Sequence, residues 1–266
     1  MSTSDAATPR RIALALGSGG ARGYAHIGVI EEVQARGWEI IGVAGTSMGA
    51  VIGGLFVGGA MESYRDWAVD LVTQREVWFT SGPMIQAMRA SIAIPTVFTP
   101  VTRNGMVLAD GGLLNPVPVA PLANVLADAI IAVNLSAPSL TGTYVREEAF
   151  TGIKFPKVKF PNLPHMIEPA LRALVPAFGR GNDGVPDNHH VLRMNTLDVV
   201  DRSLNLMQEA IRRYRLAGYP PDVLVNVPLD SCGTLDFHRA KDMIEVGRER
   251  AARAFDAWEA GEPLVL

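Results

Sequence analysis

The feature that most restricts the fold of this chain is a run without any charged residue, from Ile40 to Ala60. A run of this length is long enough to cross a bilayer. It can equally form a buried strand and helix, because parallel strands and the helices that cover them are apolar throughout. The run is rich in glycine and has no leucine-rich stretch. We therefore predict a buried strand, a tight turn and a buried helix.

Ser47 lies in the middle of this run, within Gly45-Thr46-Ser47-Met48-Gly49. β-Branched residues precede it, and a Gly/Ala-rich apolar stretch follows. This is the layout of a nucleophile elbow, in which a sharp strand-to-helix turn lifts a serine hydroxyl clear of the backbone and small neighbours let the turn close. The pattern alone fits a plain glycine-rich turn equally well, because glycine is frequent in this chain. Ser47 is a candidate nucleophile, and Gly45 and Gly49 are the elbow glycines.

A second glycine-rich loop lies upstream. The apolar run Arg11–Leu16 predicts a strand that leads into Gly17-Ser18-Gly19-Gly20-Ala21-Arg22-Gly23, and helical spacing of apolar residues follows from Tyr24 to Val33. Such a loop presents backbone N–H groups at a helix N-terminus and can hold a phosphate or an oxyanion. Dinucleotide binding fits poorly, because Arg22 stands where the third glycine should be. Walker-type binding fails, since no Lys-Ser or Lys-Thr follows.

Downstream, Asn104-Gly105 lies between the apolar runs Val97–Val101 and Met106–Ala109 and predicts a β-hairpin. Its second strand leads to Asp110, which Gly111 and Gly112 follow. Two glycines cannot shield the carboxylate from another group. The plain structural alternative for an Asp-Gly pair is an Asx-turn or a cap.

These three patterns, in this order, resemble the patatin-like phospholipases, and in particular the bacterial members related to the catalytic domain of neuropathy target esterase. The resemblance covers most of the chain. It includes Ser91–Pro95 and Phe98–Val101 before the aspartate, and Tyr214–Asp222 and Gly233–Phe237 near the C-terminus.

The resemblance implies a serine acyl hydrolase with a Ser-Asp dyad, in which Asp110 is the base that activates Ser47. The implied substrates are acyl esters of phospholipids or lysophospholipids, the implied reaction passes through an acyl-enzyme, and no metal or other cofactor is required. A carboxylate is a weaker base than imidazole, so stabilisation of the oxyanion must make up the difference. The residues implied to hold the oxyanion are Gly19, Gly20, Ala21 and Arg22, and the Asp-Gly-Gly motif contains Gly111 and Gly112.

Two other functions stay open. An α/β-hydrolase triad needs a histidine after the acid, and the histidines in that position are His165, His189, His190 and His238. None of them is well placed, and the His-Gly-Gly oxyanion motif is absent. The second alternative is a catalytically weak or silent lipid-binding or regulatory protein.

That second alternative follows from a shortage of residues between the elbow and the hairpin, relative to family members. Tyr64–Asp66 is expected to end the elbow helix, and Trp67–Leu71 to be the tail of a later strand joined abruptly to it. We therefore hypothesise an internal deletion that keeps the dyad residues but exposes the acyl pocket.

The remaining segments alternate between strand and helix patterns. We expect strands at Ala129–Leu135 and Val223–Val227, and helices at Pro121–Ala127, Asn195–Leu216 and Phe237–Glu259. This alternation predicts an α/β fold with a mostly parallel central sheet and helices on both faces, the patatin-like three-layer α/β/α arrangement.

The domain expectation is a loose tail over residues 1–10 and one hydrolase domain over 11–266, with a flexible segment at 136–191. Inside that segment, Ile153–Pro161 alternates apolar and basic residues. It fits a lipid-surface contact, a flap over the substrate or a solvated loop.

Charge and cysteine content exclude some classes of partner and cross-link. A net charge of −3 gives no basic footprint for nucleic acid. The single cysteine, Cys232, excludes an intrachain disulfide, and the N-terminus has no apolar signal segment. We expect a cytoplasmic protein, with peripheral membrane contact as an option. The sequence indicates no oligomeric state.

Overall fold

The computed structural model describes residues 8–58, 64–95, 97–138 and 196–264. By their contacts, the residues form two compact units, one of Met1–Glu147 with Asn205–Leu266 and one of Glu148–Leu204. All the described strands and the candidate site lie in the first unit. In the second unit, the structure describes only the first residues of a helix, from 196 to 204.

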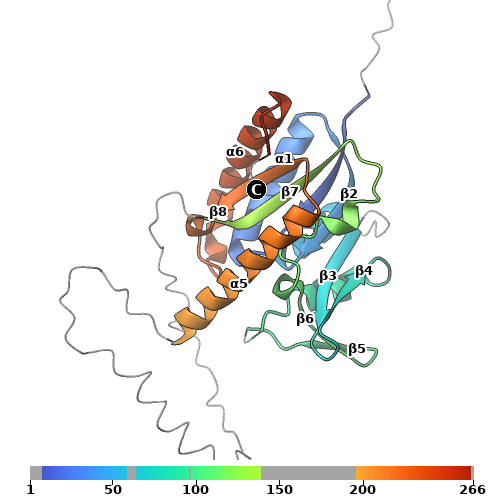
Figure 1. Ribbon diagram of the computed structural model, residues 1–266, viewed down its shortest axis with the longest axis vertical. Helices are drawn as coiled ribbons and strands as arrows, with labels where there is room; N and C mark the ends of the chain where they lie inside the picture. The colour runs from blue at the N-terminus through green and yellow to red at the C-terminus, as the bar shows by residue number, and fades with distance from the viewer. Residues whose placement is uncertain (1–7, 59–63, 96, 139–195, 265–266) are drawn as a thin grey trace, which may run out of the picture. The chain divides into compact units, whose positions relative to one another are not determined.

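The first unit is built on an eight-stranded sheet in the order β5-β6-β3-β2-β1-β7-β8, with β4 beside β3. Strands β3, β2, β1, β7 and β8 are parallel, whereas β4, β5 and β6 are joined antiparallel (Figure 1). The strands are β1 Arg11–Leu16, β2 Glu39–Thr46, β3 Tyr64–Asp70, β4 Arg75–Phe79, β5 Val101–Arg103, β6 Met106–Asp110, β7 Ala129–Ala137 and β8 Val223–Pro228. The predicted α/β fold with a mostly parallel sheet is confirmed.

Helices cover both faces of this sheet, with α1 and α6 on one side and α5 on the other (Figure 1). The α-helices are α1 Ala25–Ala35, α2 Met48–Val57, α3 Met84–Ser91, α5 Thr196–Gly218 and α6 Ala240–Glu259. The short 3-10 helices are η1 Gly20–Tyr24, η3 Gly111–Leu113, η4 Ala120–Leu122, η6 Leu229–Ser231 and η7 Phe237–Arg239.

The alternation of side chains along β1 explains the two layers of the core. Ile12, Leu14 and Leu16 point into the cluster beneath α1 and α6. Ala13 and Ala15 point to the opposite face, where they meet Leu216 of α5 among other buried side chains. All five β1 side chains are fully buried, as expected for a central parallel strand.

Strand β3 corrects the expectation for the segment after the elbow helix. Tyr64–Asp66 does not end that helix; α2 ends at Val57, and β3 is continuous from Tyr64 to Asp70. β3 pairs in parallel with β2 and antiparallel with β4 and β6. Pairing along both edges of this segment stabilises the strand, and local propensity could not reveal these partners.

Two other expectations are also wrong in detail. The first hairpin strand is Val101–Arg103, not Val97–Val101, because Pro100 has no N–H for the ladder and Phe98 turns back to donate to the Ile94 carbonyl. The predicted turn is present, with Asn104 and Gly105 at φ 49° and 79°.

The helix expected at Pro121–Ala127 is only the single turn η4, Ala120–Leu122. A segment this short, placed between a proline and the start of β7, gains too few helical hydrogen bonds to persist. Strand β4 and helix α3 were not predicted. The helices expected near Asn195–Leu216 and Phe237–Glu259 are confirmed as α5 and as η7 with α6.

Several predictions fall on residues outside the described ranges. The segment 139–195 includes Ile153–Pro161 and three of the candidate histidines, and residues 1–7 include most of the expected N-terminal tail. Ser136 and Ala137, assigned to the flexible segment, are the last residues of β7. Arg10, the end of the expected tail, is held by an ion pair to Glu259 and lies over the Trp258 ring.

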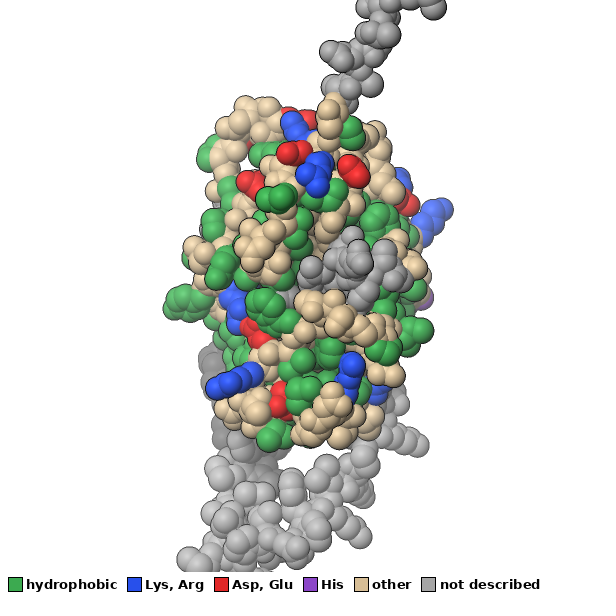
Figure 2. Space-filling model, turned by 90° about the vertical axis from the view of Figure 1, so that its right-hand side faces the viewer, with side chains coloured by type: hydrophobic (Ala, Val, Ile, Leu, Met, Phe, Trp, Pro, Cys, Tyr) green, Lys and Arg blue, Asp and Glu red, His purple; other side chains and the backbone are tan. Residues whose placement is uncertain are grey.

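In the described part of the chain, no helix is long and apolar enough to cross a membrane. The charge-free run from Ile40 to Ala60 forms most of strand β2, then Ser47, then helix α2 as far as the described residues extend. On the face shown in Figure 2, exposed hydrophobic side chains lie between scattered basic and acidic ones, and neither sign of charge forms a continuous patch on the described residues of that face.

Candidate active site

Ser47 stands at a sharp turn between β2 and α2. Its backbone has φ 55° and ψ −121°, a strained conformation for a residue with a side chain. The two flanking glycines are explained by close contacts. A Cβ on Gly45 would lie 2.6 Å from the Ala50 backbone, and one on Gly49 would lie 2.1 Å from the carbonyl oxygen of Leu16. Only hydrogen fits at either position, so the turn requires both glycines.

Strand β3 determines which residues meet Ser47. Along one edge, β3 pairs with β4 over Asp66–Asp70. Its other edge therefore carries β2 and β6 end to end, since Thr46 pairs with Trp67 and Asp110 pairs with Ala68. β2 is parallel and β6 antiparallel to β3, so their carboxyl ends run toward each other and meet at adjacent positions of β3.

The side chains of Ser47 and Asp110 are in direct contact at this meeting point. The Ser47 hydroxyl donates a hydrogen bond of 2.5 Å to Oδ2 of Asp110, although the residues are 63 positions apart in the sequence. The other carboxylate oxygen, Oδ1, accepts a hydrogen bond of 2.7 Å from the Gly112 amide. Both residues are almost fully covered, with 4% of Ser47 and 6% of Asp110 exposed.

Burial dominates the electrostatics of Asp110. Desolvation raises the pKa of its carboxyl group from 3.8 to about 6, and the hydrogen bonds from Ser47 and Gly112 only partly oppose this. The carboxylate is therefore a stronger base than an ordinary aspartate and is still mostly ionised at pH 7. When a serine hydroxyl donates to a carboxylate whose pKa is raised, the carboxylate is well placed to remove the hydroxyl proton.

The glycine loop after β1 packs directly against the elbow. A Cβ on Gly23 would lie 2.2 Å from Cγ of Met48, the residue after Ser47, and one on Gly49 would also lie 2.8 Å from the Gly17 carbonyl oxygen. Gly20 has φ 56°, and a Cβ there would lie 2.3 Å from the Thr234 carbonyl oxygen. The loop thus fits between the elbow and the chain around Thr234 because it lacks side chains.

The backbone amides of the loop differ in their engagement. The Ala21 amide donates to the Thr234 carbonyl oxygen at 2.8 Å, so it is not free to bind an oxyanion as the resemblance implied. Within the described residues, the amides of Gly19 and Gly20 have no hydrogen-bond partner. These two amides are the loop donors available for an anionic ligand.

The Arg22 side chain is buried and bonds the glycine loop to two other segments of the chain. Its guanidinium donates to the carbonyl oxygens of Leu135 at 3.0 Å and Cys232 at 2.7 Å. These bonds tie η1 to the end of β7 and to the segment after β8. Arg22 was expected among the residues that hold the oxyanion, but its guanidinium is bonded to these two carbonyl oxygens.

His26 is a buried residue in contact with the loop, and no pattern in the sequence indicated this contact. Its Nε2 lies 2.8 Å from the Gly17 carbonyl oxygen, which can only accept, so Nε2 carries the proton. Burial lowers the pKa of His26 from 6.5 to about 4. His26 is neutral at pH 7 and anchors the first residue of the glycine loop.

The other candidate groups lie apart from this contact. His238 is in η7, and the structure shows no bond between it and Asp110. Cys232 is buried, and its Sγ lies 3.4 Å from the Gly233 carbonyl oxygen. Within the described ranges, no group of three His, Cys, Asp or Glu side chains could hold a metal ion.

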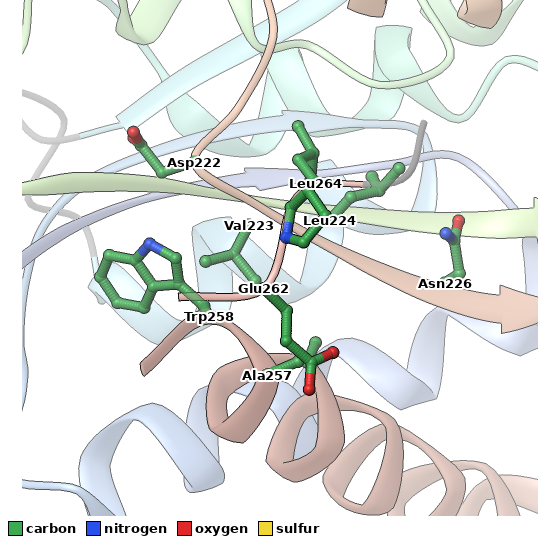
Figure 3. A pocket seen from close by; sticks show the side chains of 10 residues that line it. Asp222, Val223, Leu224, Asn226, Ala257, Trp258, Glu262 and Leu264 are labelled. Atoms are coloured by element: carbon green, nitrogen blue, oxygen red, sulfur yellow. The ribbon is translucent and has the colours of Figure 1, made fainter. Parts of the chain in front are cut away.

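A separate hollow of about 220 Å³ lies where β8 passes the end of α6 (Figure 3). Asp222 and Asn226 line it from the β8 side, Trp258 from α6, and Glu262 and Leu264 from the segment that follows α6. None of its lining residues belongs to the contact between Ser47 and Asp110.

Comparisons with known proteins agree with the resemblance seen in the sequence. Residues 62–123 match the family described as patatin-like phospholipase. An uncharacterized NTE family protein of Mycobacterium bovis is 34% identical over 94% of this chain and 92% of its own length. A lysophospholipase NTE1 of Yarrowia lipolytica is 24% identical over 90% of this chain and 19% of its own length. Among solved structures, VipD from Legionella pneumophila aligns with 94% of this chain and 67% of its own, at 10% identity and a TM-score of 0.45.

The alignment with the Mycobacterium bovis protein runs over 332 positions, although this chain has 266 residues. That relative therefore contains residues with no counterpart here. Identity of 34% across nearly the full length of both proteins is enough to establish kinship. The chain belongs to the NTE family of patatin-like phospholipases.

Proposed function

We propose that this protein is a serine acyl hydrolase that cleaves acyl esters of phospholipids or lysophospholipids, with Ser47 as nucleophile and Asp110 as base. The observation that supports this most strongly is the 2.5 Å hydrogen bond from the Ser47 hydroxyl to Oδ2 of Asp110. A buried serine that donates to a carboxylate, at a strained turn before a helix, is the arrangement that activates a hydroxyl for attack.

The reaction proceeds in two halves. Asp110 takes the hydroxyl proton as Ser47 Oγ attacks the ester carbonyl, and the tetrahedral intermediate collapses to an acyl-serine while Asp110 protonates the departing alcohol. Asp110 then takes a proton from water, which attacks the acyl-serine. The collapse of the second intermediate returns the proton to Ser47 Oγ and releases the fatty acid.

The oxyanion is held by the amides of Gly19 and Gly20. Both lie on the loop that packs against the residues flanking Ser47, and neither has a partner in the described part of the chain. Each well-placed donor of this kind is worth about 3–4 kcal/mol of transition-state stabilisation. Ala21 is left out of this role because its amide is bonded to Thr234.

The lipid substrate is supported by the family and by large apolar side chains exposed on the elements next to Ser47. Leu55 and Phe56 are exposed on α2, and Ile85 is exposed on α3. Such side chains can enter a membrane interface or meet acyl chains. Peripheral contact with the membrane is part of the proposal.

Labelling with a fluorophosphonate probe, with hydrolysis of a soluble short-chain ester in parallel, tests the assignment. The wild-type protein should be labelled at Ser47, and the rate should rise as the pH passes through about 6, where Asp110 loses its proton. Ser47→Ala and Asp110→Asn should abolish both signals, whereas His238→Ala should retain them. Loss of labelling in His238→Ala would favour a histidine triad instead.

The longer alignment of the Mycobacterium bovis relative favours one alternative, a catalytically silent protein that binds lipid. Wild-type protein that resists the probe yet co-sediments with phospholipid vesicles would support that alternative against the hydrolase.

A further inference from the structure

The end of helix α3 contacts the backbone of Ser47. The Ser91 hydroxyl oxygen accepts a hydrogen bond of 2.9 Å from the Ser47 amide. Ser91 is fully buried, so water does not compete for this bond. It lies 44 positions away in the sequence, in the segment Ser91–Pro95 that the resemblance includes without assigning Ser91 a role.

The same short segment also holds Asp110. The Ala93 carbonyl oxygen accepts a hydrogen bond of 3.0 Å from the Asp110 amide. Ser91 and Ala93 are two residues apart, at and just after the end of α3. One turn of chain therefore fixes the backbones of both residues that meet at the 2.5 Å contact.

We infer that Ser91 is a positioning residue for the proposed hydrolase and holds Ser47 in its reactive conformation through the bond to the Ser47 amide. This inference rests on the proposed function, since it assigns Ser91 a role in that reaction. Ser91 acts through Ser47 and does not touch the substrate or exchange a proton with it.

The physical reason lies in the backbone of the elbow. A serine at φ 55° is strained by about 1–3 kcal/mol and keeps this conformation only if its surroundings favour it. The Ser47 amide is buried at the point where the chain leaves β2 and α2 begins, so it has no ladder or helix partner of its own. Without Ser91 Oγ, it would be a buried donor without an acceptor, at a cost of about 1–3 kcal/mol. Relaxation of the turn would relieve both penalties and move the hydroxyl away from Asp110.

Ser91→Ala is the direct test, because it removes the acceptor and leaves a small side chain. On a soluble short-chain ester we expect kcat and the fluorophosphonate labelling rate to fall about 10- to 100-fold. KM should change less than about twofold, since a geometric defect in the nucleophile leaves ground-state binding intact. The pH midpoint should move upward from that of the wild type, because Asp110 keeps its burial but loses the hydrogen bond from Ser47 that lowers its pKa. Ser91→Thr, which retains the hydroxyl, should recover a large part of the lost rate.

Ala87→Gly is the matched control. Ala87 is a buried residue of the same helix, and glycine there loosens α3 by about 1 kcal/mol while Ser91 is retained. It should lower the melting temperature but keep kcat. A wild-type kcat in a folded Ser91→Ala variant, or an equal loss of kcat in Ala87→Gly, would overturn the positioning role while the hydrolase stands. A wild-type protein that neither reacts with the probe nor cleaves the ester would overturn the proposed function, and the role of Ser91 with it.

Discussion

At the scale of single residues, Asp110 carries a conflict between function and stability. The burial that makes it a better base also makes its ionised form costly in the folded protein. The pKa of its carboxyl group rises from 3.8 to about 6 on folding, so the folded state binds the proton more tightly than the unfolded state does. The group's contribution to stability is thus fully present below pH 3.8 and is lost as the pH rises through 6.

Asp110→Asn should therefore stabilise the protein while it abolishes labelling. Asparagine stays neutral, so at pH 8 the free energy of unfolding should rise by up to about 3 kcal/mol, and this gain should disappear below pH 3.8. Urea denaturation at the two pH values measures the effect. Asp70→Asn is a control of opposite sign, because hydrogen bonds led by that from Thr73 lower the pKa of Asp70. Equal stability of Asp110→Asn and wild type at pH 8 would show that burial does not penalise the carboxylate.

His26 should make the fold sensitive to acid. Its pKa falls from 6.5 to about 4 on folding, so the folded state favours the neutral ring. The stability from this group is present above pH 6.5 and is lost as the pH falls through 4, by up to about 3 kcal/mol. His26→Gln, whose amide can still donate to Gly17, should lose less stability than the wild type between pH 7 and pH 4 in urea titrations. Parallel pH curves for the two proteins would contradict this.

At the scale of secondary-structure elements, the contact between α2 and β1 depends on the absence of one methyl group. A Cβ on Gly49 would lie 2.1 Å from the Leu16 carbonyl oxygen, so Gly49→Ala must push α2 away from the end of β1. We expect a loss of about 3 kcal/mol in unfolding free energy and a large loss of Ser47 labelling. Calorimetry and the labelling rate measure the two effects.

Gly218→Ala is the matched control for this substitution. Gly218 ends α5, and a Cβ there would meet nothing within 4 Å. The unfolding free energy of Gly218→Ala should differ from that of the wild type by less than about 1 kcal/mol, and any difference should favour alanine. Similar losses in both variants would show that the contact of Gly49 with Leu16 is not special.

Which elements the sequence could reveal depended on how local their signals are. Strands β1, β2, β7 and β8 are short apolar runs, and the Asn104-Gly105 turn requires its residue types, so each was predictable. Helix α3 has only eight residues, and β3 owes its strand conformation to partners on both edges. Ser91 was missed as a site residue for the same reason, since no local pattern marks a hydroxyl that bonds to an amide 44 residues away.

At the scale of the whole molecule, the missing residues should affect the response to acyl length. The Mycobacterium bovis relative aligns over 332 positions, so it has additional residues that this chain of 266 lacks. Each buried methylene contributes about 0.8 kcal/mol, and a shorter chain offers less apolar wall to bury it. In a series of p-nitrophenyl esters from C4 to C16, kcat/KM should rise less per methylene here than in the relative. Equal slopes would contradict a reduced acyl pocket.

The sequence by itself determined the α/β class, a serine between two glycines after a strand, the glycine loop and the aspartate at a strand end. Each depends on a few neighbouring residues whose backbone preferences are intrinsic. Only the tertiary structure decided that Ser47 and Asp110 touch, that the Ala21 amide and the Arg22 guanidinium are bonded elsewhere, and that Ser91 supports the elbow. These contacts follow from the register of β2 and β6 along β3, and register is set by hydrogen bonds between segments far apart in the chain.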